Sequence, residues 1–140
     1  QHPKFYLFDT GVKPALARTL KDRFSEGSAA FGNAFEHMVI CEAVRLNHYF
    51  KQDFRFSYLR TKDDAAIDLI LSRGRKEILV EIKSYTQVEP KDIVALASFR
   101  RDFSHPEAEA FLLSRDAQEQ FSNGVKCLPW QTGLAEIFQR

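Results

Sequence analysis

The sequence predicts an α/β domain whose elements follow the order α-β-β-β-α-β, and three observations along its 140 residues support this order. From Gly32 to Phe50, apolar residues recur at three- and four-residue steps, the spacing of one helix face. Alternating apolar segments at 66–71 and 77–85 flank a turn and predict a β-hairpin. Pro90 then opens a helical pattern to about Phe103, and an apolar strand-like segment, 110–114, follows.

The remaining segments complete this order. We expect a short strand at residues 4–8, a short helix at 13–21 and a loop at 25–30. A strand at 54–59 precedes the hairpin, a strand at 125–130 follows 110–114, and Thr132 is expected to cap a last helix, 133–138. The length suits a single domain, with residues 1–30 as an N-terminal strand and helix and residues 31–140 as the core.

Composition excludes several classes of protein. The hydrophobic fraction of 44% and the charged fraction of 28% are ordinary for a soluble globular domain. The apolar runs are too short to cross a bilayer, and no signal peptide is visible. Cys41 and Cys127 both sit in apolar patterns, which argues against a disulfide framework, and we expect a reduced, cytoplasmic protein. The sequence contains no glycine-rich phosphate loop, so it does not predict nucleotide binding by such a loop. Because the net charge is only +1, any contact with nucleic acid must come from local patches of basic residues.

The hairpin has one register that separates apolar from charged residues. A turn centred at Gly74 and Arg75 makes three apolar pairs on one face: Ile67 with Ile82, Leu69 with Val80, and Leu71 with Ile78. The opposite face then pairs Asp68 with Glu81 and places Lys83 across from Ala66. A slip of one residue would mix the two faces, so the pattern favours this register.

Asp68, Glu81 and Lys83 would then form a site suited to a divalent cation. Directly opposed β-carbons lie about 4.5–5.5 Å apart, and two carboxylates at that separation repel each other. Mg²⁺ or Mn²⁺ would relieve the repulsion, since both ions prefer oxygen ligands. Lys83 would orient an attacking water or hold a phosphate. Alternatively, the three side chains form only a weak ion pair on a solvated strand face.

The same residues resemble a known superfamily. Glu36 on the first helix, Asp68 on a middle strand and E81-I-K83 on the next strand resemble the PD-(D/E)XK nucleases. Five segments, together spanning nearly the whole chain, resemble the C-terminal domain of unknown function of prokaryotic AAA-type ATPases: KFYLFDTGV, GNAFEHMVICE, YLRTKDDAAIDLIL, ILVEIKS and CLPW. The resemblance implies a restriction-endonuclease-like core, with a mixed central sheet flanked by helices, at the C-terminal end of a longer ATPase.

The resemblance also implies roles for individual residues. Asp68 and Glu81 would be ligands of Mg²⁺ or Mn²⁺, Glu36 a supporting carboxylate and Lys83 the catalytic lysine. Ala66 is a departure, because the family often has an acidic residue two positions before the aspartate.

Two hypotheses of function follow. The first is a metal-dependent nuclease that hydrolyses phosphodiester bonds in DNA. The second is a non-catalytic DNA-binding or protein-interaction module that serves the attached ATPase. Four residues could contact DNA, although a solvated turn is the simpler interpretation for the first three: Arg73, Arg75 and Lys76 at the hairpin tip, and Gln87 after Lys83.

Overall fold

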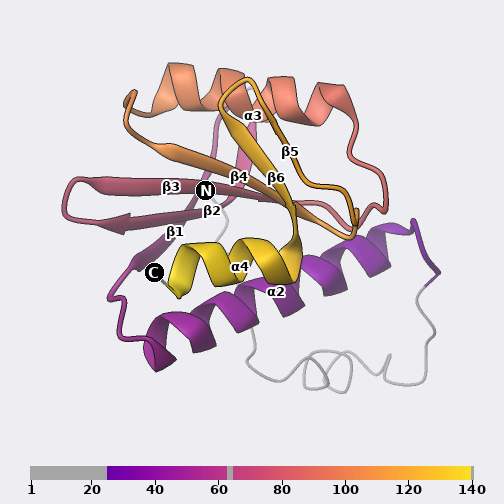
Figure 1. The fold of residues 1–140 in the computed structure, drawn as a ribbon. Coiled ribbons are helices and arrows are strands. Elements are labelled where there is room, and N and C mark those ends of the chain that lie inside the picture. The colour runs from indigo at the N-terminus through magenta and orange to yellow at the C-terminus, as the bar shows by residue number, and fades with distance from the viewer. Residues whose placement is uncertain (1–24, 63–64, 140) are drawn as a thin grey trace.

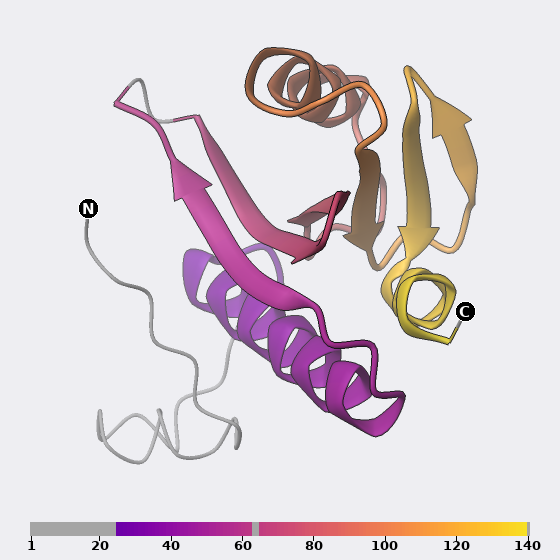
Figure 2. The ribbon, with the colours of Figure 1, turned by 90° about the vertical axis from the view of Figure 1, so that its left-hand side faces the viewer.

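The computed structural model describes residues 25–62 and 65–139, which form a mixed six-stranded sheet with helices on both faces (Figures 1 and 2). In chain order the elements are α2 (Ala29–Tyr49), β1 (Arg55–Arg60), β2 (Ala66–Arg73), β3 (Lys76–Ile82), α3 (Pro90–Phe103), β4 (Glu109–Ser114), β5 (Gln120–Ser122), β6 (Val125–Pro129) and α4 (Trp130–Phe138). The strand expected at 4–8 and the helix expected at 13–21 lie outside the described residues.

The sheet has the strand order β1-β2-β3-β4-β6-β5. β1, β2 and β3 pair antiparallel, as consecutive strands joined by short turns do. β3, β4 and β6 pair parallel, and α3 is the crossover that brings the chain from β3 to β4. The predicted α-β-β-β-α-β order and the mixed sheet are therefore confirmed.

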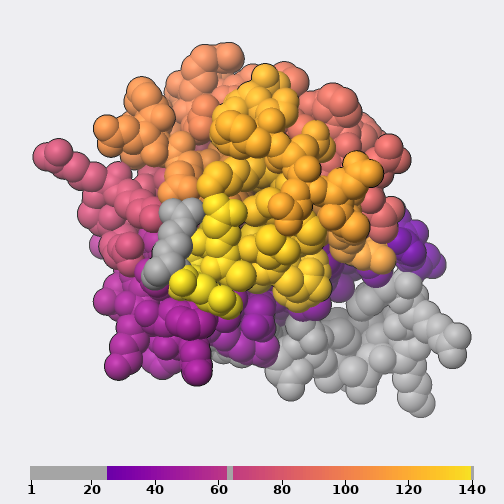
Figure 3. Space-filling view, in the orientation of Figure 1, coloured from indigo at the N-terminus to yellow at the C-terminus, as the bar shows by residue number. Residues whose placement is uncertain are grey.

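Two apolar clusters, one on each face of the sheet, hold the layers together. The first lies under α2 and α4 and includes Ile78, Val80 and Ile82, which alternate along β3. The second lies under α3 and includes Leu79 from the same strand. Both faces of β3 are thus covered, which explains its nearly continuous apolar sequence. In Figure 3, α3 forms the upper edge of the molecule and α2 the lower edge, with the C-terminal segment between them.

Two predicted helix boundaries are wrong. α2 begins at Ala29, three residues before the predicted start, because the Ser28 side chain accepts the Phe31 N–H at 3.1 Å and caps the helix inside the expected loop. α4 begins at Trp130 and follows Pro129 directly, so Thr132 lies within the helix and does not cap it.

A further strand, β5, was not predicted from the sequence. It pairs antiparallel with β6 through a two-residue turn at Asn123 and Gly124, whose φ angles are 52° and 75°. Such Asn-Gly turns have the twist of a tight hairpin, so the pair was a usable signal. In the described part of the chain, no helix is long and apolar enough to cross a membrane. Cys41 and Cys127 are buried free thiols.

Candidate functional site

β2 carries a bulge at the position of Asp68. The register between β1 and β2 shifts by one residue between Ser57 and Leu59. Two residues of β2, Asp68 and Leu69, therefore lie opposite one residue of β1, Tyr58. A bulge of this kind interrupts the alternation of side chains and changes the direction in which they point.

The bulge overturns one predicted pair. Ile67 packs in the cluster under α3, beside Leu96, whereas Leu69 and Ile82 pack in the cluster under α2 and α4. Ile67 and Ile82 therefore lie on opposite faces of the sheet. The apolar pattern carried no sign of this, because Ile67 is buried on whichever face it occupies.

The remaining apolar register is confirmed. The β2–β3 ladder runs through five pairs: Leu69 with Val80, Ile70 with Leu79, Leu71 with Ile78, Ser72 with Glu77, and Arg73 with Lys76. Just beyond the Leu69–Val80 pair, at the end of the ladder away from the turn, the Asp68 carboxylate accepts the backbone N–H of Ile82 through Oδ2 at 2.8 Å. The side chain of Asp68 takes the place of a ladder carbonyl, and this holds the carboxylate between the two strands.

Asp68, Glu81 and Lys83 meet at this end of the hairpin. The Glu81 side chain shares a hydrogen bond with Asp68, and its Oε1 lies 3.5 Å from Lys83 Nζ. The Glu81 and Lys83 side chains are only 16% and 28% exposed. The backbone N–H of Lys83 donates to Leu113 O at 2.9 Å, so the parallel neighbour β4 fixes the position of the lysine.

The charges in this cluster shift each other's ionisation. Burial, helped by the negative charge of Asp68, raises the pKa of Glu81 to about 8, although Lys83 opposes the shift. Burial acts to lower the pKa of Lys83, but nearby carboxylates, Glu81 and Asp92 first among them, outweigh it and raise that pKa. At neutral pH the two carboxyl groups therefore hold a proton in common, and the ammonium stays charged.

A pocket of about 430 Å³ opens beside this cluster. Its described lining comes from β2, β3, α3 and the residues directly before β2 and after β3: Ala65, Ala66, Ile67, Glu81, Lys83, Asp92, Ala95, Leu96, Ser98, Phe99, Asp102 and Phe103. Asp92 was not predicted as a site residue from the sequence. It stands in the first turn of α3, where an acidic residue is explained by the helix dipole alone, so nothing in the pattern linked it to Lys83.

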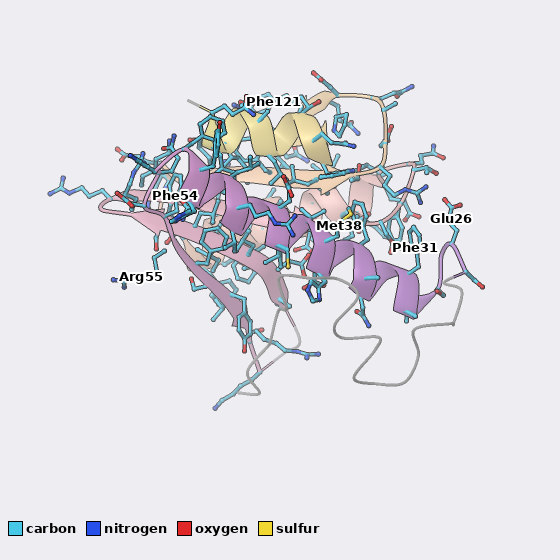
Figure 4. All side chains as sticks on the ribbon, turned by 90° about the horizontal axis from the view of Figure 1, so that it is seen from below. Glu26, Phe31, Met38, Phe54, Arg55 and Phe121 are labelled. Carbon is cyan, nitrogen blue, oxygen red and sulfur yellow. The ribbon has the colours of Figure 1, made fainter. Side chains whose placement is uncertain are left out.

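The structure does not bring Glu36 into the lining of this pocket. Glu36 lies half-buried on α2, whose first turn is near the end of β3, since a β-carbon at Gly32 would lie 3.7 Å from Ser84 Oγ. Arg115, which follows β4, contacts the same end of α2: its Nη1 donates to Glu26 Oε1 at 2.8 Å, and its guanidinium lies over the ring of Phe31. Figure 4 shows Glu26 and Phe31 at this N-terminal end of α2, and Phe54 at the opposite end. The supporting role of Glu36 stays a prediction.

The donor set fits a divalent cation held by two protein carboxylates. Asp68 and Glu81 offer oxygen atoms, which Mg²⁺ and Mn²⁺ prefer, and a cation would replace the proton that they share. Among residues 25–62 and 65–139, no three His, Cys, Asp or Glu side chains are grouped closely enough to hold a metal ion. Water and a substrate phosphate would therefore fill the other positions, as is usual for Mg²⁺.

The DNA contacts predicted at the hairpin tip do not join this site. From Lys76 to Glu81, β3 advances by five residues, about 17 Å at 3.3 Å each. Arg73 is engaged locally, donating to Gln52 Oε1 at 2.8 Å and lying over the ring of Phe54. Lys76 Nζ lies 3.7 Å from a Glu109 carboxylate oxygen.

The two other predicted contacts are exposed. Arg75 stands at the hairpin tip and belongs to a different pocket from Glu81. Gln87 lies in the loop between β3 and α3, at the same end of the sheet as Lys83, but it is not part of the lining described above.

Together these features define an α/β domain with a mixed sheet and a half-buried carboxylate–lysine cluster at the end of its central hairpin. The sequence of residues 31–132 matches the family described as "Domain of unknown function (DUF4143)". Because the match covers well over half of the chain, this protein belongs to the DUF4143 family. No curated protein has a significantly similar sequence.

Proposed function

We propose that this domain is a metal-dependent nuclease with a PD-(D/E)XK-type site on a restriction-endonuclease-like core, and that it hydrolyses phosphodiester bonds in DNA. One observation carries the proposal. Asp68 and Glu81 share a hydrogen bond beside the Lys83 ammonium, and Glu81 and Lys83 line an open pocket. Two acids and a cation in this arrangement suit phosphoryl chemistry with Mg²⁺ or Mn²⁺ better than they suit a structural ion pair.

Each residue has a role that follows from its contacts. When bound between Asp68 and Glu81, the cation supplies positive charge at the scissile phosphate and acidifies water. The Ile82 N–H keeps the Asp68 carboxylate in a fixed orientation. Lys83, anchored by Glu81 at 3.5 Å, orients the attacking water and neutralises charge that develops on the phosphate. Burial removes competing bulk water and strengthens these interactions.

The resemblance to C-terminal domains of ATPases supports an ATPase module as a partner of this domain. We infer that the domain acts next to an AAA-type ATPase module of the same polypeptide. ATP-driven movement of that module would present DNA to the domain or withdraw it.

Cleavage assays test the nuclease proposal directly. The purified chain is incubated with Mg²⁺ or Mn²⁺ and with single-stranded, duplex or branched DNA. We expect cleavage, and a loss of at least 100-fold in Asp68→Asn and in Lys83→Ala. Lys76→Ala is the matched control, because Lys76 lies on the same strand but at the far end of the hairpin. Absence of cleavage of all three DNAs with both ions would overturn the proposal.

A non-catalytic module is the second candidate, and one observation favours it. Glu36 does not line the pocket, so the three-carboxylate set that the resemblance implies is not assembled among the described residues. A DNA-binding or protein-interaction module of this fold would keep its partner affinity in Asp68→Asn. Divalent cations would leave its melting temperature unchanged.

A further inference from the structure

The pocket beside Glu81 has an apolar lining that phosphodiester hydrolysis does not require. Phe99, Phe103 and Ala95 line it from α3, and Ile67 lines it from β2. The Phe99 and Phe103 ring centres are 4.8 Å apart, and Phe103 is 54% exposed. A large aromatic residue so exposed at a concave site offers a flat face to a ligand.

Hydrogen-bond acceptors line the same pocket. Asp92, Ser98 and Asp102 add oxygen atoms along α3. Asp92 Oδ2 is buried and, in the part of the chain that the structure describes, has no hydrogen-bond partner. Leaving a buried acceptor unpaired is costly, so the chemistry of the pocket calls for a ligand that brings N–H donors. The Lys83 ammonium is near enough to interact electrostatically with Asp92, but it pairs with Glu81 and makes no hydrogen bond to Asp92 Oδ2.

The ligand must therefore have flat apolar faces, carry N–H donors on its edge and be joined to a phosphate that reaches Lys83. A nucleobase with an exocyclic amino group meets all three conditions. The volume of about 430 Å³ falls within the range of about 300–1,000 Å³ of small-ligand pockets. A base in a duplex cannot enter such a pocket until it leaves the stack.

We propose that this pocket binds one unpaired, amino-bearing nucleobase of the DNA strand, with its ring against Phe103 and its amino group donating to Asp92. The inference rests on the proposed nuclease function and specifies its substrate as single-stranded or locally unpaired DNA. The neighbouring phosphate of the same strand then lies against Lys83 and the carboxylate pair.

Binding without divalent metal tests this pocket separately from cleavage. The probe is a fluorescein-labelled 12-nucleotide single strand, compared with its duplex and with strands that carry one abasic position. Base–aromatic stacking accounts for about 5- to 150-fold in affinity. We expect Phe103→Ala to weaken single-strand binding by that factor without lowering the melting temperature. Val94→Ala is the control, since Val94 is 52% exposed on α3 but does not line the pocket.

The acceptor is tested by base identity. The chain should bind strands of adenine or cytosine more tightly than strands of thymine, which lack an exocyclic amino group. Asp92→Asn should lose this preference, because the amide replaces one acceptor oxygen with a donor group.

Each outcome has a defined meaning. Equal affinity for duplex and single strand, no effect of any abasic position, or equal binding by Phe103→Ala and Val94→Ala would each overturn the base pocket. Binding of an arginine-rich peptide that depends on Phe103, with no binding of DNA, would overturn it as well. If DNA binding depends on Phe103 but neither ion supports cleavage, the base pocket is supported and the nuclease proposal is overturned. If cleavage occurs while Phe103→Ala binds the single strand as tightly as the wild type, the nuclease proposal is supported and the base pocket is overturned.

Discussion

Glu81 makes the stability of the domain depend on pH. Its pKa is raised from 4.5 to about 8 by burial and by Asp68, so the folded state keeps a proton that the unfolded state loses above about pH 4.5. The contribution of protonated Glu81 to the stability of the folded state is complete below about pH 4.5 and is lost as the pH rises towards 8. Glu81→Gln keeps the shape and a donor for Asp68 without titrating. We expect the free energy of unfolding of this variant to exceed that of the wild type by roughly 2–4 kcal/mol at pH 9.

Urea unfolding of the metal-free chain at pH 5, 7 and 9 measures this difference. Between pH 5 and 9, the free energy of unfolding should fall more steeply in the wild type than in Glu81→Gln. Parallel pH profiles for the two proteins would show that Glu81 titrates normally in the folded state.

Asp68 stabilises the fold in addition to any role in chemistry. Its Oδ2 accepts the Ile82 N–H at 2.8 Å, and Ile82 is 6% exposed, so Asp68→Ala leaves a buried donor unpaired. We expect a loss of about 1–3 kcal/mol in the free energy of unfolding at pH 5, where Glu81 is protonated and repulsion is small. Asp68→Asn retains an acceptor and should lose less. If Asp68→Ala is as stable as the wild type, this hydrogen bond contributes nothing.

How far single residues could be predicted depended on local pattern. The closeness of Asp68, Glu81 and Lys83 followed from the alternation of apolar residues along two strands, which is a local signal. Asp92 could not be found in this way. Its approach to Lys83 depends on how α3 packs across the sheet. The sequence of a helix alone does not predict which residues of other elements its polar side chains will contact.

Among the elements, α3 was predicted with its bounds because Pro90 at its start and its apolar spacing agree. The bulge in β2 could not be predicted, since apolar residues stand on both sides of it. β5 was missed for a different reason. It has only three residues, too few to show alternation, although the Asn123–Gly124 turn marked its end.

The contact between α4 and β4 is tight enough to require glycine at position 133. A β-carbon at Gly133 would overlap Leu113 Cδ2, and Leu113 is fully buried and cannot move aside easily. Overpacking costs about 1–3 kcal/mol, more than the gain of up to about 1 kcal/mol from replacing a helical glycine. We therefore expect Gly133→Ala to destabilise the domain in chemical denaturation.

Gly32 provides the control for this prediction. It is also helical, and an added β-carbon there would meet Ser84 Oγ at 3.7 Å, an ordinary contact. Gly32→Ala should raise the free energy of unfolding by about 0.5–1 kcal/mol. Two substitutions of the same kind would then have opposite signs. A stabilising Gly133→Ala would mean that α4 can shift away from the sheet.

At the scale of the whole molecule, the element order was predictable and the meeting of distant elements was not. Strand order follows from short connections and from α3 as a crossover. Whether Glu36 on α2 approaches the site depends on where that helix lies along the sheet, which Ser28 and Arg115 help to set. Periodicity fixes which face of a helix is apolar, but it does not fix that position.

Metal binding is the whole-molecule property that separates the two proposed functions. A cation that binds only the folded chain stabilises it by mass action, by about 2.7 kcal/mol at one hundred times its dissociation constant. The nuclease proposal therefore predicts that Mn²⁺ raises the melting temperature by several degrees. The rise should be larger at pH 8 than at pH 6, because the cation must displace the proton shared by Asp68 and Glu81.

The double variant Asp68→Asn, Glu81→Gln removes both charges and should show no rise with Mn²⁺. Asp102→Asn is the matched control, because it removes one carboxylate from the same pocket while leaving the pair intact, and it should respond as the wild type does. An equal rise in the wild type and the double variant would place the cation elsewhere. No rise in the wild type at either pH would favour the non-catalytic module, since a nuclease of this type needs the ion to hold its substrate phosphate.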